Sequence, residues 1–109
     1  MADQAGRSEG MTLATFFEWE IIEGRETEFH EAWALVTKRL HARGSKGSSL
    51  FVNEAGHYCA FALWPDRQTR DVAFAMDEKL PADSEAMRAC IARTIHRMDM
   101  DRLDDLWLI

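Results

Sequence analysis

The stretch TLATFFEWEII, residues Thr12 to Ile22, carries large apolar side chains on both faces of a predicted β-strand. Aromatic and β-branched residues are typical of strands, in which successive side chains point to opposite faces. One face therefore carries Leu13, Phe17, Trp19 and Ile21, and the other carries Phe16 and Ile22. A strand with one face in water would alternate more cleanly between apolar and polar residues. We therefore expect this strand to be covered on both sides.

Two helices are predicted in the middle of the chain. The first spans Gly24 to Arg43, with acidic residues early and basic residues late, an order that the helix dipole favours. Its apolar face, at helical spacing, consists of Phe29, Ala32, Trp33, Val36 and Leu40. The second helix is expected to be capped by Asp66 and to end near Met76.

Between these helices the sequence predicts a β-hairpin. Its arms are Ser49 to Asn53 and His57 to Trp64, joined by a turn in which Gly56 can take a positive φ. Pro65 ends the second arm because proline has no amide hydrogen to donate to a neighbouring strand. One face of that arm carries Tyr58, Ala60, Ala62 and Trp64. The two alanines leave this face shallow between two large aromatic side chains.

The last third of the chain is expected to hold one more helix and one more strand. Asp83 or Ser84 caps this third helix, which ends near Met98. Its apolar face is expected to consist of Met87, Cys90, Ile91, Ile95 and Met98. The segment from Asp101 to Ile109 is predicted as the final strand, and it is again apolar on both sides.

This order of elements predicts an α+β fold, a ferredoxin-like split βαβ sandwich. We expect a four-stranded antiparallel sheet with helices on one face, formed by residues 11–109 as a single domain after a flexible N-terminal tail, residues 1–10. The helices cover only one face, and 109 residues leave nothing to cover the other. We therefore expect a homodimer that packs through the bare sheet face.

Composition excludes several classes of function. A formal net charge of −6 argues against nucleic acid as a partner and against binding to an anionic membrane surface. No apolar run approaches the roughly 20 residues that span a bilayer, and residues 1–10 are too polar for a secretory signal. Cys59 and Cys90 lack metal-site spacing, so we predict buried free thiols and a cytoplasmic location.

Two runs of sequence carry a resemblance to a known family. They are WEIIEGRETEFHEAW and GSSLFVNEAGHYCAFALWPDRQTRDVAF. The features that match are Gly24, Arg25, Glu26 and Phe29 at the start of the first helix, then Gly47 and Ser48, then Trp64 and Pro65. Together they resemble the antibiotic biosynthesis monooxygenase-type domains of the dimeric α/β-barrel superfamily. The resemblance covers roughly Leu13 to Phe74, and beyond that it extends only to the order of elements.

The resemblance implies a function. Members of that family include oxygenases that use no metal, flavin or haem, in which a phenol or anthrone-like ring is deprotonated and itself reduces O₂. It therefore implies a cofactor-independent monooxygenase, with no cofactor and no metal, acting on a small aromatic or polyketide-like compound. Such a site needs an apolar pocket for a flat ring, one or two polar groups that remove and hold a proton, and exclusion of bulk water.

Two other classes of function stay open. The chain could be a non-catalytic dimeric barrel that binds a small ligand or serves in assembly, or an isomerase or lyase that needs a base but no O₂. A resemblance to haem-degrading enzymes with this fold would rest on different residues: an Asn on the first strand, a Trp on the third strand and a haem-ligand His on the second helix. Only Trp64 matches that pattern, so haem degradation is not expected.

Candidate catalytic residues cluster near the hairpin turn. Histidine is the side chain suited to accept a proton at physiological pH, so His57 is our candidate proton acceptor, with Tyr58 and Asn53 expected to orient substrate oxygens. A solvated loop is the alternative explanation for the same three residues. No group of His, Asp or Glu shows the spacing of a metal site.

Candidate substrate-binding residues are mainly tryptophans. Trp33 and Trp64 are predicted to form the walls of an aromatic pocket between the first helix and the sheet, with volume left by the two alanines of the hairpin. Trp19 and His96 are further candidates for the lining. Ordinary packing in the core or in a dimer interface is the alternative for the tryptophans.

Overall fold

Four antiparallel strands form one sheet in the order β2-β3-β1-β4. The computed structural model describes residues 11–77 and 79–108, so the expected tail, residues 1–10, lies outside it. The strands are β1 (Leu13–Ile21), β2 (Gly47–Val52), β3 (Tyr58–Trp64) and β4 (Ile91–Asp101). The helices of the described part are α2 (Glu26–His41), α3 (Arg67–Ala75) and α4 (Ala82–Ala89).

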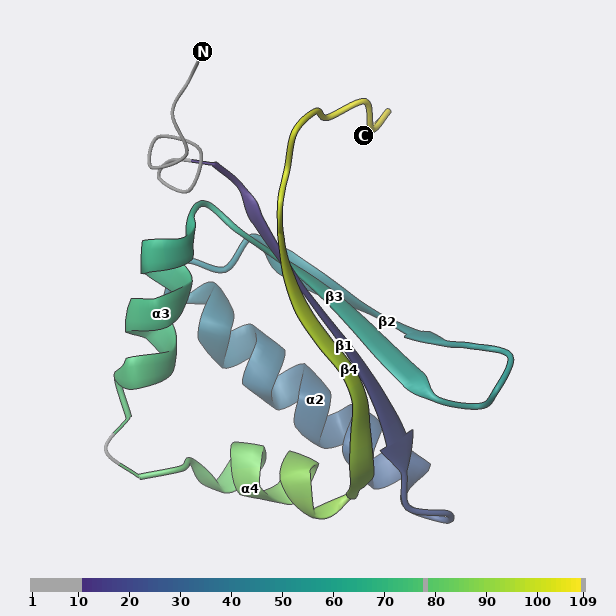
Figure 1. Cartoon of the computed structure of the whole chain (residues 1–109). Coiled ribbons are helices and arrows are strands. Elements are labelled where there is room, and N and C mark those ends of the chain that lie inside the picture. Colours follow the sequence, from purple (N-terminus) through teal and green to yellow (C-terminus); the bar gives the residue numbers. More distant parts are fainter. Residues whose placement is uncertain (1–10, 78, 109) are drawn as a thin grey trace.

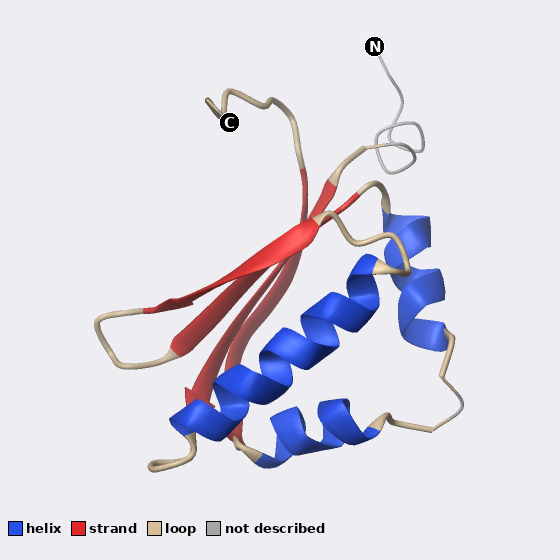
Figure 2. Ribbon diagram, turned by 180° about the vertical axis from the view of Figure 1, so that it is seen from behind, coloured by secondary structure: helices blue, strands red, loops and turns tan. Residues whose placement is uncertain are grey.

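All three of these helices lie on the same side of the sheet (Figures 1 and 2). The predicted fold class is therefore confirmed as an α+β, ferredoxin-like sandwich with an antiparallel sheet and helices on one face. None of the described helices is both long and apolar enough to cross a membrane.

The structure confirms the first two predicted helices and the hairpin, together with the cap and the turn glycine expected from their sequences. Asp66 caps α3, since its Oδ1 accepts a hydrogen bond from the Thr69 amide at 2.7 Å. Gly56 takes a positive φ of 83° in the hairpin turn. Gly44, shortly after the end of α2, has a φ of 106°, and a Cβ there would lie 2.6 Å from the Thr69 methyl group. A larger residue at this position would push α2 and α3 apart.

The prediction for the last third of the chain was wrong. The helix expected to run to Met98 is α4, which starts after Pro81 and ends at Ala89. The residues that follow it form β4, and the segment 102–108, expected as the last strand, lies outside any strand. Two β-bulges explain the error, because they disturb the two-residue alternation by which a strand is recognised.

The described helices cover one face of the sheet and leave the other face open. Thr15, Phe17 and Trp19 of β1 point toward the helices, on what we call the inner face. Neighbouring strands place a second set of apolar side chains on the opposite, outer face, namely Phe16, Phe51, Phe61, Met98 and Met100. No described helix covers the outer face, and Met98, Met100 and Phe51 are exposed in the single chain. Cys59 and Cys90 are buried free thiols, as predicted.

A buried arginine ties α3 to the sheet. Arg70 is only 5% exposed, and its Nη1 donates to the Oγ1 of Thr15 at 3.1 Å. The same guanidinium holds both carboxylate oxygens of Asp99 on β4, at 2.9 and 3.1 Å. This contact holds the pKa of Asp99 below its usual range. The network therefore links β1, β4 and α3 at one end of the helix layer.

Replacing Asp99 should destabilise the fold. Asp99→Ala leaves the terminal nitrogens of the buried Arg70 guanidinium without their carboxylate, and only the exposed Asp71 still pairs, with its Nε; breaking a buried pair in this way typically costs about 3 kcal/mol. We expect the free energy of unfolding in urea to fall by about that amount. The control is Asp105→Ala, which removes an exposed ion pair with Arg102 and should cost less than about 1 kcal/mol. Equal losses in the two variants would contradict a structural role for the buried network.

Candidate active site

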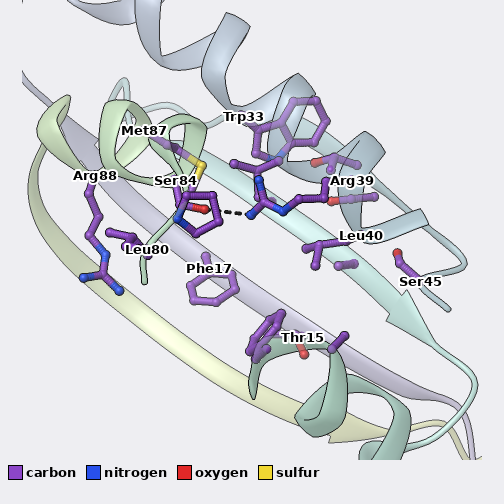
Figure 3. Close-up of a pocket in the computed structure, with 18 of the residues that line it drawn as sticks. Thr15, Phe17, Trp33, Arg39, Leu40, Ser45, Leu80, Ser84, Met87 and Arg88 are labelled. Atoms are coloured by element: carbon purple, nitrogen blue, oxygen red, sulfur yellow. Dashed lines mark hydrogen bonds between the residues drawn. The ribbon is translucent and has the colours of Figure 1, made fainter. Parts of the chain in front are cut away.

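A cavity of about 610 Å³ lies between the inner face of the sheet and the helices (Figure 3). Its volume falls within the roughly 300–1,000 Å³ typical of small-molecule sites. Ala60 and Ala62 of β3 line it, and their short side chains leave room above the sheet. The shallow face predicted from the hairpin sequence is therefore part of this cavity.

Aromatic side chains form much of the wall. The structure places all three predicted tryptophans, Trp19, Trp33 and Trp64, on the lining of this cavity. Phe17 stacks on Trp19, with ring centroids 5.0 Å apart and planes at 11°. Trp64 is 1% exposed and belongs to the core as well as to the wall. The lining suits a flat apolar ring, while the binding role of each tryptophan stays a prediction.

Two arginines, Arg39 in α2 and Arg43 just after its end, connect the helices around the cavity. Arg39 forms an ion pair with Asp83, and its Nη2 donates to the Oγ of Ser84 at 2.9 Å, both at the start of α4 (Figure 3). Arg43 holds both oxygens of Asp77, just after α3, at 2.9 Å each. This bidentate ion pair lowers the pKa of Asp77 and raises that of Arg43.

Three of the predicted residues lie away from this cavity, around Glu18. Glu18 shares the outer face with Cys59 and His96, its register partners on β3 and β4. Its carboxylate contacts the Nδ1 of His57 at 2.7 Å, the Nδ1 of His96 at 2.9 Å and the amide of Asn53 at 3.0 Å. These contacts, that of His57 foremost, lower the pKa of Glu18 from 4.5 to about 2. We call these four polar residues, Glu18, Asn53, His57 and His96, the outer cluster.

Tyr58 takes a third position. It lines a separate hollow of about 400 Å³ beside the start of α2, together with Glu26 and His30. Its ring also packs edge-on against Phe29, with centroids 5.6 Å apart. The predicted group of Asn53, His57 and Tyr58 is therefore divided, because neighbouring residues of a strand point to opposite faces. The catalytic roles of His57 and Tyr58 stay predictions, and neither residue lines the large cavity.

Sequence reasoning missed the cationic part of the lining. Arg39 and Arg43 follow Val36 at positions i+3 and i+7, so the helical period already places both near the apolar face of α2. Arg97 could not be found because its segment was interpreted as helix. In the structure it lies on β4, and its guanidinium sits over the Phe17 ring, 5.5 Å from the centroid.

A metal site is not formed by the described residues. Across residues 11–77 and 79–108, no group of three His, Cys, Asp or Glu side chains is placed to hold an ion. The outer cluster contributes one carboxylate and two imidazoles, and these side chains contact one another.

Comparison with solved structures supports the predicted fold. The crystal structure of SnoaB, a cofactor-independent oxygenase from Streptomyces nogalater, aligns with a TM-score of 0.74 and 18% identity, covering 88% of this chain and 97% of SnoaB. A protein of Bordetella bronchiseptica named for the antibiotic biosynthesis monooxygenases aligns with a TM-score of 0.70 and 17% identity, covering 85% and 98%. A similarly named Caulobacter crescentus protein gives 0.73 and 13%, covering 87% and 92%.

These likenesses establish the class of fold. The described chain has the fold of the antibiotic biosynthesis monooxygenase structures, as the sequence resemblance predicted. No family model matches the sequence, and no curated protein matches it. At 13–18% identity the likeness to these three structures is one of backbone architecture, and the chemistry must be argued from the site.

The outer cluster should make stability depend on pH on the acid side. Because the pKa of Glu18 is about 2 in the folded chain against an ordinary 4.5, its contribution is present above pH 4.5 and is lost as pH falls toward 2. Glu18→Gln cannot titrate there, so its free energy of unfolding should fall less steeply between about pH 5 and about pH 3. Urea unfolding across that range measures the difference. Glu54→Gln, in the hairpin turn, is the control, and a wild-type curve parallel to that of Glu18→Gln would contradict the assignment.

Proposed function

We propose that this protein is a cofactor-independent monooxygenase whose substrate, a small aromatic or polyketide-like compound, binds in the cavity between the helices and the sheet. The observation that carries the proposal is the cavity itself, about 610 Å³ in volume and lined by Trp19, Trp33 and Trp64. The shared fold with SnoaB, described as a cofactor-independent oxygenase, supports the choice of reaction.

The proposed reaction needs little from the protein. For an anthrone-type ring, the reactive CH₂ becomes C=O, one oxygen atom of O₂ enters the substrate and the other leaves as water. All four electrons come from the substrate, so no reductant is needed. The protein must favour loss of the ring proton, orient the resulting carbanion or phenolate, and limit the access of water. The aromatic wall supports the orientation of a flat ring.

Proton removal is the step that the lining supports least directly. Among the described lining residues there is no His and no Tyr, and Asp77 is the one carboxylate, with both oxygens held by Arg43. A substrate in this cavity must therefore ionise without a free strong base beside it. His57 and Tyr58 remain proposed catalytic residues for a substrate that reaches the outer cluster or the smaller hollow.

We also propose that the chain works as a homodimer through the outer face. Phe51, Met98 and Met100 are 39–58% exposed there in the single chain. The segment 102–108 adds further exposed apolar side chains, namely Leu103, Leu106, Trp107 and Leu108. Exposed apolar side chains of this kind are stabilised by contact with a complementary surface, and a two-fold pairing of sheets provides it.

Filling the cavity should abolish turnover. Ala62→Phe places a ring in the space proposed for the substrate, and even a small displacement of the reacting atoms can cost about 100-fold in rate. We expect oxygen uptake with anthrone, measured with an oxygen electrode, to fall by about that factor while the circular dichroism spectrum is retained. Ala55→Phe, the same change in the exposed hairpin turn, is the matched control.

Three outcomes would oppose the oxygenase assignment. Anthrone that binds without oxygen uptake in the wild type would favour a non-catalytic binding protein. Equal conversion in anaerobic buffer would favour an isomerase or lyase. Equal rates in Ala62→Phe and Ala55→Phe would move the reaction away from this cavity.

The dimer can be tested separately. Met98→Glu places a charge on the outer face at the edge strand β4, where Met98 is 43% exposed in the single chain, so the fold itself should tolerate it. We expect light scattering after gel filtration to give about twice 12.5 kDa for the wild type and about 12.5 kDa for the variant. Val72→Glu, on the exposed side of α3, should stay dimeric. A wild-type monomer would refute the proposal.

A further inference from the structure

We propose that the cavity selects aromatic compounds that carry a negatively charged oxygen group, a carboxylate or an ionised phenol, held by Arg39, Arg88 and Arg97. This inference rests on the proposed function, because it takes the large cavity to be the substrate site. It adds the chemical class of the substrate and the residues that determine it.

The first support is the charge of the lining. The chain as a whole has a net charge of −6, yet the titratable groups of the cavity are mostly cationic. They are Arg39, Arg43, Lys79, Arg88 and Arg97, against the single carboxylate of Asp77. Asp77 neutralises Arg43, with two hydrogen bonds of 2.9 Å, and Asp83 pairs with Arg39, so the lining arginines without an ion pair among the described residues are Arg88 and Arg97.

Arg88 and Arg97 lie on the side of the cavity formed by α4 and β4. Both are exposed, and no described carboxylate lies within ion-pair distance of either. Through space, Arg97 contributes to the lowered pKa of Asp99. Its oxygens are already held by Arg70 and Arg67, at 2.9–3.2 Å. Arg97 instead lies over the face of Phe17, which leaves its charge available at the edge of an aromatic surface.

Arg39 supplies the contact inside the cavity. Its two terminal nitrogens are used by Asp83 and Ser84, and Figure 3 shows the guanidinium reaching between α2 and α4. Its Nε is buried and has no hydrogen-bond partner, and the same is true of the Oγ of Ser48, which also lines the cavity. A buried N–H without an acceptor is unfavourable. A ligand oxygen that reaches the Arg39 Nε would supply the missing acceptor.

These contacts fit the chemistry of the proposed step. The lining offers no free base to a substrate, but its guanidinium groups stabilise a substrate that is already anionic or becomes so on binding. Guanidinium binds carboxylate and phenolate oxygens in a planar, directional way. The aromatic wall then holds the ring while the cations hold the charge, so that both parts of one molecule are recognised.

The test compares two ligands that differ in charge and share one ring system. Isothermal titration calorimetry on the full chain measures the dissociation constants of 2-naphthoate and of the neutral 2-naphthamide. We expect naphthoate to bind at least about tenfold more tightly, and this preference to shrink at high ionic strength. In the double variant Arg88→Gln, Arg97→Gln, whose positions are exposed and should tolerate the change, the preference should fall, because Arg39 is then the only one of the three arginines left to hold the anion.

The matched control is Arg93→Gln. Arg93 lies on the same strand but pairs with Glu20 outside the cavity, so the preference for naphthoate should be retained. Equal binding of the two ligands by the wild type would overturn the charge preference and leave the cavity as a ligand site. A preference that survives the double variant and is lost in Arg93→Gln would overturn the assigned residues. Binding of neither ligand would overturn the inference, while oxygen uptake by Ala62→Phe decides the proposed function independently.

Discussion

Arg39, in the last turns of α2, and Arg43, just after its end, hold the helix layer together around an open space. One reaches the start of α4 and the other the end of α3, so the three helices are joined by ion pairs as well as by packing on the sheet. Ala60 and Ala62 lie on the cavity side of β3, where larger residues would fill the gap. A space that ordinary packing would close is therefore kept open by charged contacts between helices and by small residues on the sheet.

Much of the fold could be predicted because its signals are local. The cap at Asp66, the turn at Gly56 and the two-sided strand β1 each follow from a few neighbouring residues. The last strand was missed because β4 contains two bulges. Ala92 and Ile95 have no register partner on β1, so the apolar residues of β4 fall at spacings that resemble a helix. Only the neighbouring strand, which local sequence does not reveal, decides between the two.

The site was predictable in its apolar part and not in its polar part. A tryptophan can be assigned to a wall from its element and its face, and the alanines of β3 already indicated free volume. Polar function depends on which side chains meet across elements. His57 and Tyr58 are adjacent in sequence yet lie on opposite faces, and His57 joins His96, from the far end of the chain, on Glu18. Arg97 lines the cavity because its segment is a strand, and a helix predicted over the same residues would not place it there.

The placement of the four tryptophans gives the protein an internal optical reporter. Three indoles line the cavity, and Trp107 is 70% exposed in the single chain. Indole emits at shorter wavelength in apolar surroundings than in water, so the blue side of the fluorescence spectrum comes from the cavity, and Trp107 contributes to the red side while its segment is not covered by a second chain. A ring that enters the cavity lies against the blue emitters alone. The two parts of the emission band therefore distinguish events inside the cavity from events on the surface of the same molecule.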